Sequence, residues 1–131
     1  MILEWSAEIP FTQDAIRKDV PSRAGVYQFL QSEEYPRYKG KTRVLKIGES
    51  SRGLRGEILN HQTRHTAANR LARIRKLSDA HVSVIYALIL DGSTKEIESE
   101  LLRQFEDSHW DLPMLNSNRG YGRDTDKHYR E

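Results

Sequence analysis

The fold is decided by two short stretches, Gly25-Val-Tyr-Gln-Phe-Leu30 and Arg43-Val-Leu-Lys-Ile-Gly48. Both are rich in aromatic and β-branched residues, which fit the pleated surface of a sheet, so we predict a strand at each. The polar stretch from Gln31 to Thr42 contains proline and glycine and is predicted to be a loop. Because consecutive strands usually pair, the two strands are expected to form an antiparallel hairpin with a long loop.

Helices are predicted on both sides of this hairpin. Residues 12–19 are expected to form a short helix with Thr12 as the N-cap, and this helix ends before Pro21. After the second strand, helical segments are expected at about 53–61 and at about 64–77.

A third strand and a last helix are predicted in the second half of the chain. The stretch from Val82 to Leu90 is the most apolar one and is expected to be a central strand buried on both faces. Ser93 or Thr94 can cap a helix that runs to about Glu106. The predicted order is α-β-β-α-α-β-α, an α/β chain of the α+β type with a small, mostly antiparallel three-stranded sheet flanked by helices.

Length and composition limit the class of protein. The 131 residues suit one domain, which we place at residues 1–118, followed by a polar C-terminal tail at 119–131. Cysteine is absent, which excludes disulfides, Cys-ligated zinc, iron–sulfur clusters and thiol nucleophiles. The apolar run 82–90 is far shorter than the roughly 18–20 residues of a membrane span. No signal peptide is expected, so the cytoplasm is the default location.

The charges are segregated along the chain. The 21 Lys and Arg and the 19 Asp and Glu leave a formal charge of only +2. Residues 52–76 carry seven basic residues and one acidic residue, a balance of +6, and residues 91–111 carry seven acidic and two basic residues, a balance of −5. A basic helical pair beside an acidic helix suits a polyanionic substrate and a cation-binding carboxylate; the alternative is a set of solvated helix faces.

Two charged side chains are predicted to point toward apolar faces. With about 100° per residue, Glu98 falls in the middle of the apolar arc of its helix, where a carboxylate is costly unless it is paired or bound to a metal. Arg55 likewise points inward from the helix at 53–61, whereas Glu57 points off that face and His61 lies on its edge. Arg55 and Glu98 are expected either to pair with each other or to stand around a bound phosphate and metal.

Several motifs occur in an order that resembles the GIY-YIG nuclease superfamily. Gly25-Val26-Tyr27 stands about twenty residues before Lys46-Ile47-Gly48, and the two are similar to the signature pair of that family. The resemblance covers roughly residues 10–118. Its further elements are Leu54, Ile58 and His61 in the following helix, Glu98 before Leu101-Leu102, and Asn116 at the end of the domain.

The resemblance implies metal-dependent hydrolysis of phosphodiester bonds in nucleic acid, with Mg²⁺ or Mn²⁺ as cofactor and DNA expected rather than RNA. Glu98 would hold the cation, and Tyr27 would be the base that takes a proton from the attacking water. An Arg would balance the charge on the phosphate. His61 would relay a proton or orient the nucleophile, and supporting roles fall to Gly25, Gly48 and Asn116.

Two positions depart from the pattern of the family. Lys46 replaces the usual Tyr of the second motif, and an ammonium beside Tyr27 would favour its phenolate, so this change is compatible with activity. Glu57 stands where the family has Arg, and a carboxylate cannot stabilise phosphate charge. Arg55, Arg52 or an Arg of the next helix would have to substitute; otherwise the domain is a catalytically degenerate nucleic-acid-binding module.

Nucleic-acid contacts are expected from the loop between the first two strands, where Tyr35 and Tyr38 are interleaved with basic residues. Trp5 and Trp110 are interpreted as core or lid packing rather than as base-stacking residues. The basic residues assigned to nucleic-acid binding are Lys39, Lys41, Arg52, Arg64, Arg70 and Arg73.

The leading prediction is therefore a Mg²⁺- or Mn²⁺-dependent endonuclease that acts on DNA as a monomer or homodimer, without a membrane partner. The degenerate binding module is the alternative, and a small interaction protein without a nucleic-acid role is the third hypothesis. Cleavage in the presence of the cation separates the first two, and binding at low salt separates the second from the third.

Overall fold

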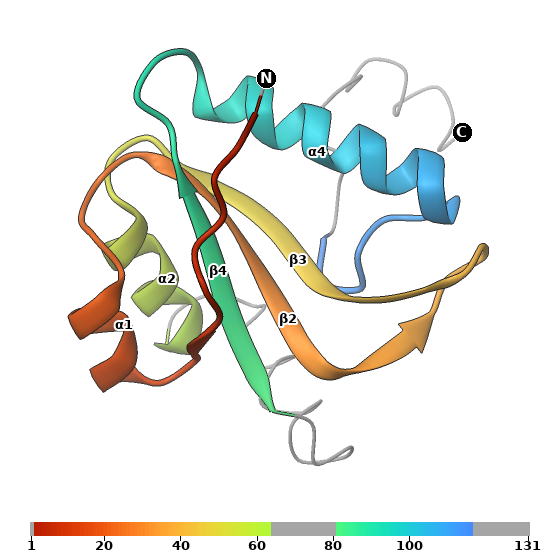
Figure 1. Cartoon of the computed structure of the whole chain (residues 1–131), viewed down its shortest axis with the longest axis horizontal. Coiled ribbons are helices and arrows are strands. Elements are labelled where there is room, and N and C mark those ends of the chain that lie inside the picture. The colour runs from red at the N-terminus through yellow and green to blue at the C-terminus, as the bar shows by residue number, and fades with distance from the viewer. Residues whose placement is uncertain (1, 64–80, 117–131) are drawn as a thin grey trace.

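The computed structural model describes residues 2–63 and 81–116, and this part of the chain has an α+β architecture (Figure 1). Four strands form one antiparallel sheet in the order β1-β4-β2-β3, and three helices accompany it. The strands are β1 (Ile9–Pro10), β2 (Gly25–Pro36), β3 (Lys41–Ser50) and β4 (Val82–Leu88), and the helices are α1 (Gln13–Asp19), α2 (Leu54–Thr63) and α4 (Thr94–His109). The helix expected at 64–77 and the tail at 119–131 lie outside the described residues.

The predicted sheet of three strands is one strand short, because β1 also belongs to it. Ile9 and Pro10 pair with Val84 and Ser83 of β4. A strand of two residues shows no alternation of polar and apolar side chains, so the sequence carries no signal for it. β1 is an edge strand, where a proline without a backbone N–H is tolerated.

β4 lies inside the sheet, between β1 and β2, as its apolar sequence predicts. Val84 and Ala87 are fully buried, but Ile85 and Tyr86 are only half-buried. The prediction of burial on both faces is therefore wrong for part of this strand. For Ile85 the reason is that α4 packs mainly on β3 and β2 rather than on β4. Tyr86 lies on the opposite face, where it packs against the edge of the core formed with α1 and α2.

The β2–β3 hairpin is longer than predicted, and its loop is much shorter. Strand pairing extends as far as Pro36 and Lys41, so the loop expected at 31–42 is wrong. A register shift before Tyr35 takes up the extra residues of β2. Tyr35 is buried, and its hydroxyl donates a hydrogen bond to the carbonyl of Val44 in β3. This contact supports strand pairing in a stretch whose composition is that of a loop.

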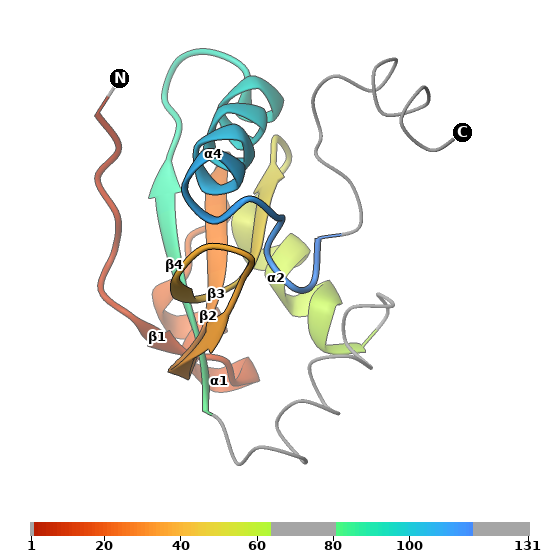
Figure 2. The ribbon, with the colours of Figure 1, turned by 90° about the vertical axis from the view of Figure 1, so that its right-hand side faces the viewer.

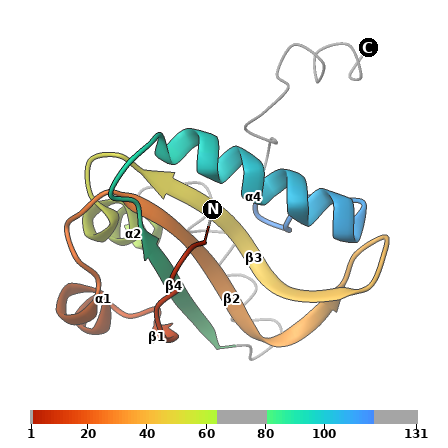
Figure 3. The same cartoon turned by 45° about the horizontal axis from the view of Figure 1, so that its top comes forward.

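Neighbouring residues of the hairpin face two different cores. Tyr27 and Phe29 of β2 pack with apolar residues of α1 and α2. Val26 of β2 and Ile47 of β3 pack with apolar residues of α4. Figure 3 shows α4 lying along β3 and away from α1 and α2. The hairpin is thus enclosed between α4 and the α1–α2 pair.

The predicted helix caps are present. The Thr12 hydroxyl accepts a hydrogen bond from the N–H of Ala15, and the Ser93 hydroxyl accepts one from the N–H of Glu96. α4 continues past its predicted end and is closed by Trp110, which has a left-handed conformation with φ 60°. Within the described ranges, no helix combines the length and the apolar character that crossing a bilayer requires.

Candidate functional site

Tyr27 occupies the centre of the candidate site, and two glycines make room for it and its strand. Its ring passes directly over Gly48, where a Cβ atom would lie 2.3 Å from Cζ of Tyr27. At Gly25 a Cβ would lie 2.5 Å from the carbonyl oxygen of Ala87 in β4. A larger residue would require the Tyr27 ring to move at Gly48, and at Gly25 it would require the backbone of β4 or β2 to move. Gly25 and Gly48 were expected to have supporting roles. In the structure each glycine lets a neighbouring group come close to the backbone, the carbonyl of Ala87 at Gly25 and the ring of Tyr27 at Gly48.

The hydroxyl of Tyr27 binds two polar side chains of α2. Its oxygen lies 3.0 Å from Oε2 of Glu57 and 2.8 Å from Nε2 of His61, and Oε2 and Nε2 are 3.3 Å apart. An ionised carboxylate only accepts hydrogen bonds. The Tyr27 hydroxyl therefore donates to Glu57 when Glu57 is charged, and it then accepts from the Nε2–H of His61.

Tyr27 is a neutral phenol at physiological pH in this environment. Burial raises the pKa of Tyr27 well above its usual value, and the carboxylates of Glu57, Glu98 and Glu49 raise this pKa further. Lys46 was expected to favour the phenolate, and this expectation is wrong because burial first, and the three carboxylates in addition, favour the neutral phenol.

Glu98 is half-buried on α4, as the helical periodicity predicts. Burial raises the pKa of Glu98 to about 7, and the carboxylates of Glu49 and Glu57 raise this pKa in addition. The ammonium groups of Lys46 and Lys95 act in the opposite direction. Burial is therefore the main reason for the raised pKa, because two carboxylates and two ammonium groups act on Glu98 in opposite directions.

Arg55 is not brought to this site. Its Nε donates a hydrogen bond of 2.8 Å to the carbonyl oxygen of Val20, at the end of α1. The inward face of α2 that carries Arg55 therefore meets α1, whereas the face with Glu57 and His61 meets Tyr27. The expectation that Glu57 points away from the interior is wrong for this reason. Arg55 and Glu98 were expected either to pair or to stand together around a phosphate and metal, and both alternatives are wrong because Arg55 binds the end of α1.

Asn116 completes the outer edge of β3 beside the site. Its Oδ1 accepts a hydrogen bond from the N–H of Ile47, and its Nδ2 donates one to the carbonyl of Ile47, both at 2.9 Å. The amide thus replaces a neighbouring strand at this position, which is a structural role.

The residues assigned to nucleic-acid binding are dispersed. Lys39 and Lys41 are exposed at the tip of the β2–β3 hairpin, at the opposite end of β2 from Tyr27, and Arg52 is exposed just before α2. The others, Arg64, Arg70 and Arg73, lie outside the described residues.

Two residues of the site were not anticipated from the sequence. Glu49 follows Gly48 directly, and its carboxylate accepts a hydrogen bond of 2.6 Å from the hydroxyl of Thr94 at the start of α4. The one signal for Glu49 is its place after the Lys46-Ile47-Gly48 motif, while Thr94 was considered only as a helix cap.

The residues suit a hydrated cation better than a cation held by the protein alone. In residues 2–63 and 81–116, no group of three or more His, Cys, Asp or Glu side chains could hold a metal ion directly. Mg²⁺, however, usually keeps several waters and is bound through one or two carboxylates. Glu98 can supply one such carboxylate. Its pKa is raised to about 7, and an adjacent cation would stabilise its charged form.

Searches of protein-family models, of curated proteins and of solved structures return no significant match to this chain. The chemistry of the site is therefore argued from its own geometry.

Proposed function

We propose that this domain hydrolyses phosphodiester bonds in nucleic acid, with DNA as the substrate and a divalent cation as cofactor. The observation that carries the proposal is the group of ionisable side chains around the Tyr27 hydroxyl. Glu57 and His61 form hydrogen bonds with it. Glu49 and Glu98 are close enough to raise the pKa of Tyr27. Groups with shifted pKa values gather preferentially at functional sites, and the strand motifs resemble those of GIY-YIG nucleases.

Glu98 is the residue that we assign to the cation, Mg²⁺ or Mn²⁺. Its pKa of about 7 is caused by burial and by neighbouring carboxylates, so bound positive charge would favour its ionised form. When bound, the cation would polarise the scissile phosphate and offset its negative charge. Lys46, whose ammonium acts on Glu98, would add positive charge on the same side of the site.

Tyr27 and Glu57 would move the proton of the attacking water. Because its pKa is raised, Tyr27 accepts this proton only while it passes its own proton to Glu57, 3.0 Å away. The water oxygen forms the new bond to phosphorus, and the leaving oxygen keeps the electron pair of the broken bond. Glu57 is then a proton acceptor at the position where the family pattern has Arg.

A nucleic-acid-binding module without hydrolysis is the second candidate, and two observations favour it. Arg55, the expected substitute for the missing Arg, binds Val20 instead, and Tyr27 is only 1% exposed. Without a guanidinium among the described residues of the site, the charge of the transition state would rest on the cation and Lys46.

A cleavage assay decides between the two candidates. The protein is incubated with supercoiled plasmid and with single-stranded DNA in Mg²⁺, in Mn²⁺ and in EDTA. We expect cleavage with either cation and none in EDTA. Glu98→Gln, Glu57→Gln and Tyr27→Phe should each lower the rate roughly 100-fold or more. Glu96→Gln is the matched control, since Glu96 is exposed on the same helix, and it should retain the rate.

Binding of Mn²⁺, measured by its paramagnetic signal, gives a readout that does not depend on turnover. The wild type and Glu96→Gln should bind the ion. Glu98→Gln should bind it at least about tenfold more weakly, because the ion loses one carboxylate ligand. Salt-sensitive DNA binding in EDTA without cleavage under any condition would establish the binding module instead. Full activity of Glu98→Gln would contradict the assignment of the cation.

A further inference from the structure

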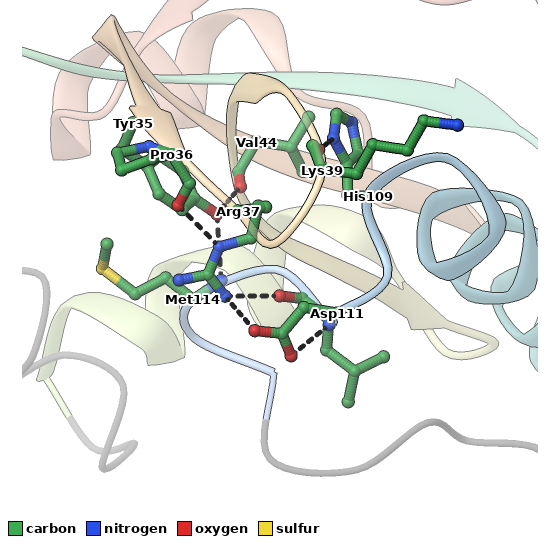
Figure 4. Close-up of polar contacts among 9 residues, drawn as sticks. Tyr35, Pro36, Arg37, Lys39, Val44, His109, Asp111 and Met114 are labelled. Atoms are coloured by element: carbon green, nitrogen blue, oxygen red, sulfur yellow. Dashed lines mark hydrogen bonds and ion pairs between the residues drawn. The ribbon is translucent and has the colours of Figure 1, made fainter.

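Hydrogen bonds join the tip of the β2–β3 hairpin to the end of α4 and to the residues that follow it (Figures 2 and 4). The N–H of Lys39 donates a hydrogen bond of 3.0 Å to the carbonyl of His109, and Nδ1 of His109 donates one of 2.9 Å to the carbonyl of Lys39. Nη1 of Arg37 donates to Oδ2 of Asp111 and to the carbonyl of Leu112, at 3.0 and 2.9 Å. These bonds hold the tip in one arrangement.

Trp110 ends α4 in a conformation that tryptophan rarely adopts. Its φ of 60° and ψ of 24° are left-handed, a region that favours glycine at the end of a helix. Its side chain is 65% exposed, so the core does not use the indole ring. The interpretation of Trp110 as a core residue is therefore wrong, and its interpretation as lid packing stays a prediction. Trp5, by contrast, packs against the core beneath α4, as expected.

The groups around Trp110 are those that bind nucleotides. Nζ of Lys39 lies 5.5 Å from the centre of the Trp110 ring. Tyr38, with 81% of its surface exposed, and Lys41, also exposed, belong to the same tip. Exposed aromatic rings beside lysines are typical of surfaces that bind single-stranded nucleic acid, since bases stack on the rings and lysines contact phosphates.

One carboxylate beside the ring is already paired. Asp111 follows Trp110 directly, and its carboxylate forms an ion pair of 3.0 Å with Arg37. Lys39, whose Nζ lies over the Trp110 ring, is therefore not the partner of Asp111.

We propose that Tyr38, Lys39, Lys41 and Trp110 (the tip platform) bind an unpaired segment of nucleic acid, with one base stacked on Trp110. The identity of the polymer rests on the proposed function. The strain at Trp110 supports the inference, because a large exposed ring at a glycine-like position does not serve the fold.

The position of the tip platform defines the substrate further. Tyr27 and Pro36 lie near opposite ends of β2, and a strand of that length spans at most roughly 30 Å. Successive stacked nucleotides are about 3.4 Å apart. A strand that reaches both sites would therefore extend up to about nine nucleotides from the bond that is cleaved.

Tryptophan fluorescence tests the tip platform directly. In a Trp5→Phe background, Trp110 is the single fluorescent indole, and it is titrated in EDTA with an oligothymidylate of about 15 nucleotides. We expect quenching on binding. Trp110→Ala should weaken binding about tenfold, whereas Trp110→Phe should stay within about threefold of the parent, both measured by anisotropy of a labelled oligonucleotide.

Trp110→Gly separates stacking from folding. Glycine suits the left-handed conformation, so this variant should melt at the same or a higher temperature and still bind about tenfold more weakly. Leu90→Ala is the control, since Leu90 is an exposed apolar residue away from the tip platform, and its affinity should equal that of the parent.

Parental affinity in Trp110→Ala and Trp110→Gly, or an unquenched Trp110 in the bound state, would overturn the tip platform. A preference for blunt duplex over the oligothymidylate would overturn it as well. Because binding is measured in EDTA, an inactive protein leaves this test valid, and cleavage by the Trp110 variants leaves the proposed function standing. Absence of binding to any nucleic acid would contradict both.

Discussion

The two ends of the β2–β3 hairpin expose their polar groups to opposite extents. At one end the hydroxyl of Tyr27 is buried with Glu57 and His61. At the other end Tyr38 and Trp110 extend into solvent. The same two strands run from one end to the other. The two ends differ in exposure because different segments cover them. α2 supplies the partners of Tyr27, whereas the end of α4 and the residues just after it contact the tip.

Burial thus decides what each end can do chemically. At the covered end, low solvent access lets neighbouring carboxylates change the pKa of Tyr27 and of Glu98, which suits proton transfer and cation binding. At the exposed tip, solvent and salt screen the charges, so rings and lysines are left to contact a ligand. Three mutational predictions test this contrast, ordered from the largest expected effect to the smallest, and a pH profile follows them.

Gly48→Ala should have the largest effect, because it acts on the most closely packed point of the covered end. The added Cβ would lie 2.3 Å from Cζ of Tyr27, and the free energy of unfolding should fall by about 1–3 kcal/mol. Gly56→Ala is the control: its Cβ meets nothing within 4 Å, and alanine should stabilise α2 by about 0.5–1 kcal/mol. Urea denaturation measures both. Equal stabilities would show that the Tyr27 ring moves aside freely.

Asn116→Ala should lower the free energy of unfolding by about 1–2 kcal/mol, since Ile47 loses two hydrogen bonds at once. Amide hydrogen exchange at Ile47 should become faster. Asn60→Ala, at an exposed position of α2, should leave both quantities nearly unchanged. Unaltered exchange at Ile47 would mean that the edge of β3 is protected by other contacts.

Arg37→Lys should loosen the exposed end without unfolding the covered one. Lysine cannot reproduce the contacts of Nη1 to both Asp111 and Leu112, and we expect a loss of about 1 kcal/mol. The amide of Lys39 should exchange faster, while Tyr27 keeps its chemical shifts. Arg103→Lys, which changes an exposed pair with Glu100, should alter neither. Shifts that change at both ends would show that the two ends are coupled.

The pH dependence of stability should report the raised pKa of Glu98. Its pKa is about 7 in the folded chain against a usual value of 4.5, so the folded state binds a proton that the unfolded state releases between these values. Stability from Glu98 should therefore fall as the pH rises from about 4.5 to about 7. Denaturation of Glu98→Gln across this range should show a flatter profile, and Glu96→Gln should follow the wild type. Parallel profiles for all three proteins would contradict the raised pKa.

The parts of the fold that depend on neighbouring residues were predictable. The caps at Thr12 and Ser93 each need a side chain and a backbone N–H three residues away, so their signals are local. The half-buried position of Glu98 likewise follows from the periodicity of a single helix. β1 was missed because its two residues have no pattern of their own and exist as a strand only through β4.

The candidate site was predictable only in part. A helical wheel states which side chains of α2 share a direction, but it does not state where the sheet and α1 lie around the helix. Arg55 was therefore expected in the site, and Glu57 takes its place beside Tyr27. The exposure of Trp110 could not be predicted for a similar reason, since tryptophan side chains are on average highly buried.

The sequence by itself determined the inner parts of the hairpin strands at 25–30 and 43–48, the two helix caps and the inward turn of Glu98, because each depends on residues close together in the chain. Tertiary structure alone decided that Glu57 and His61 bind the Tyr27 hydroxyl, that Arg55 serves the end of α1, and that the hairpin tip fastens to α4. These contacts join residues distant in sequence. They depend on how the helices lie against the sheet, which no local pattern specifies.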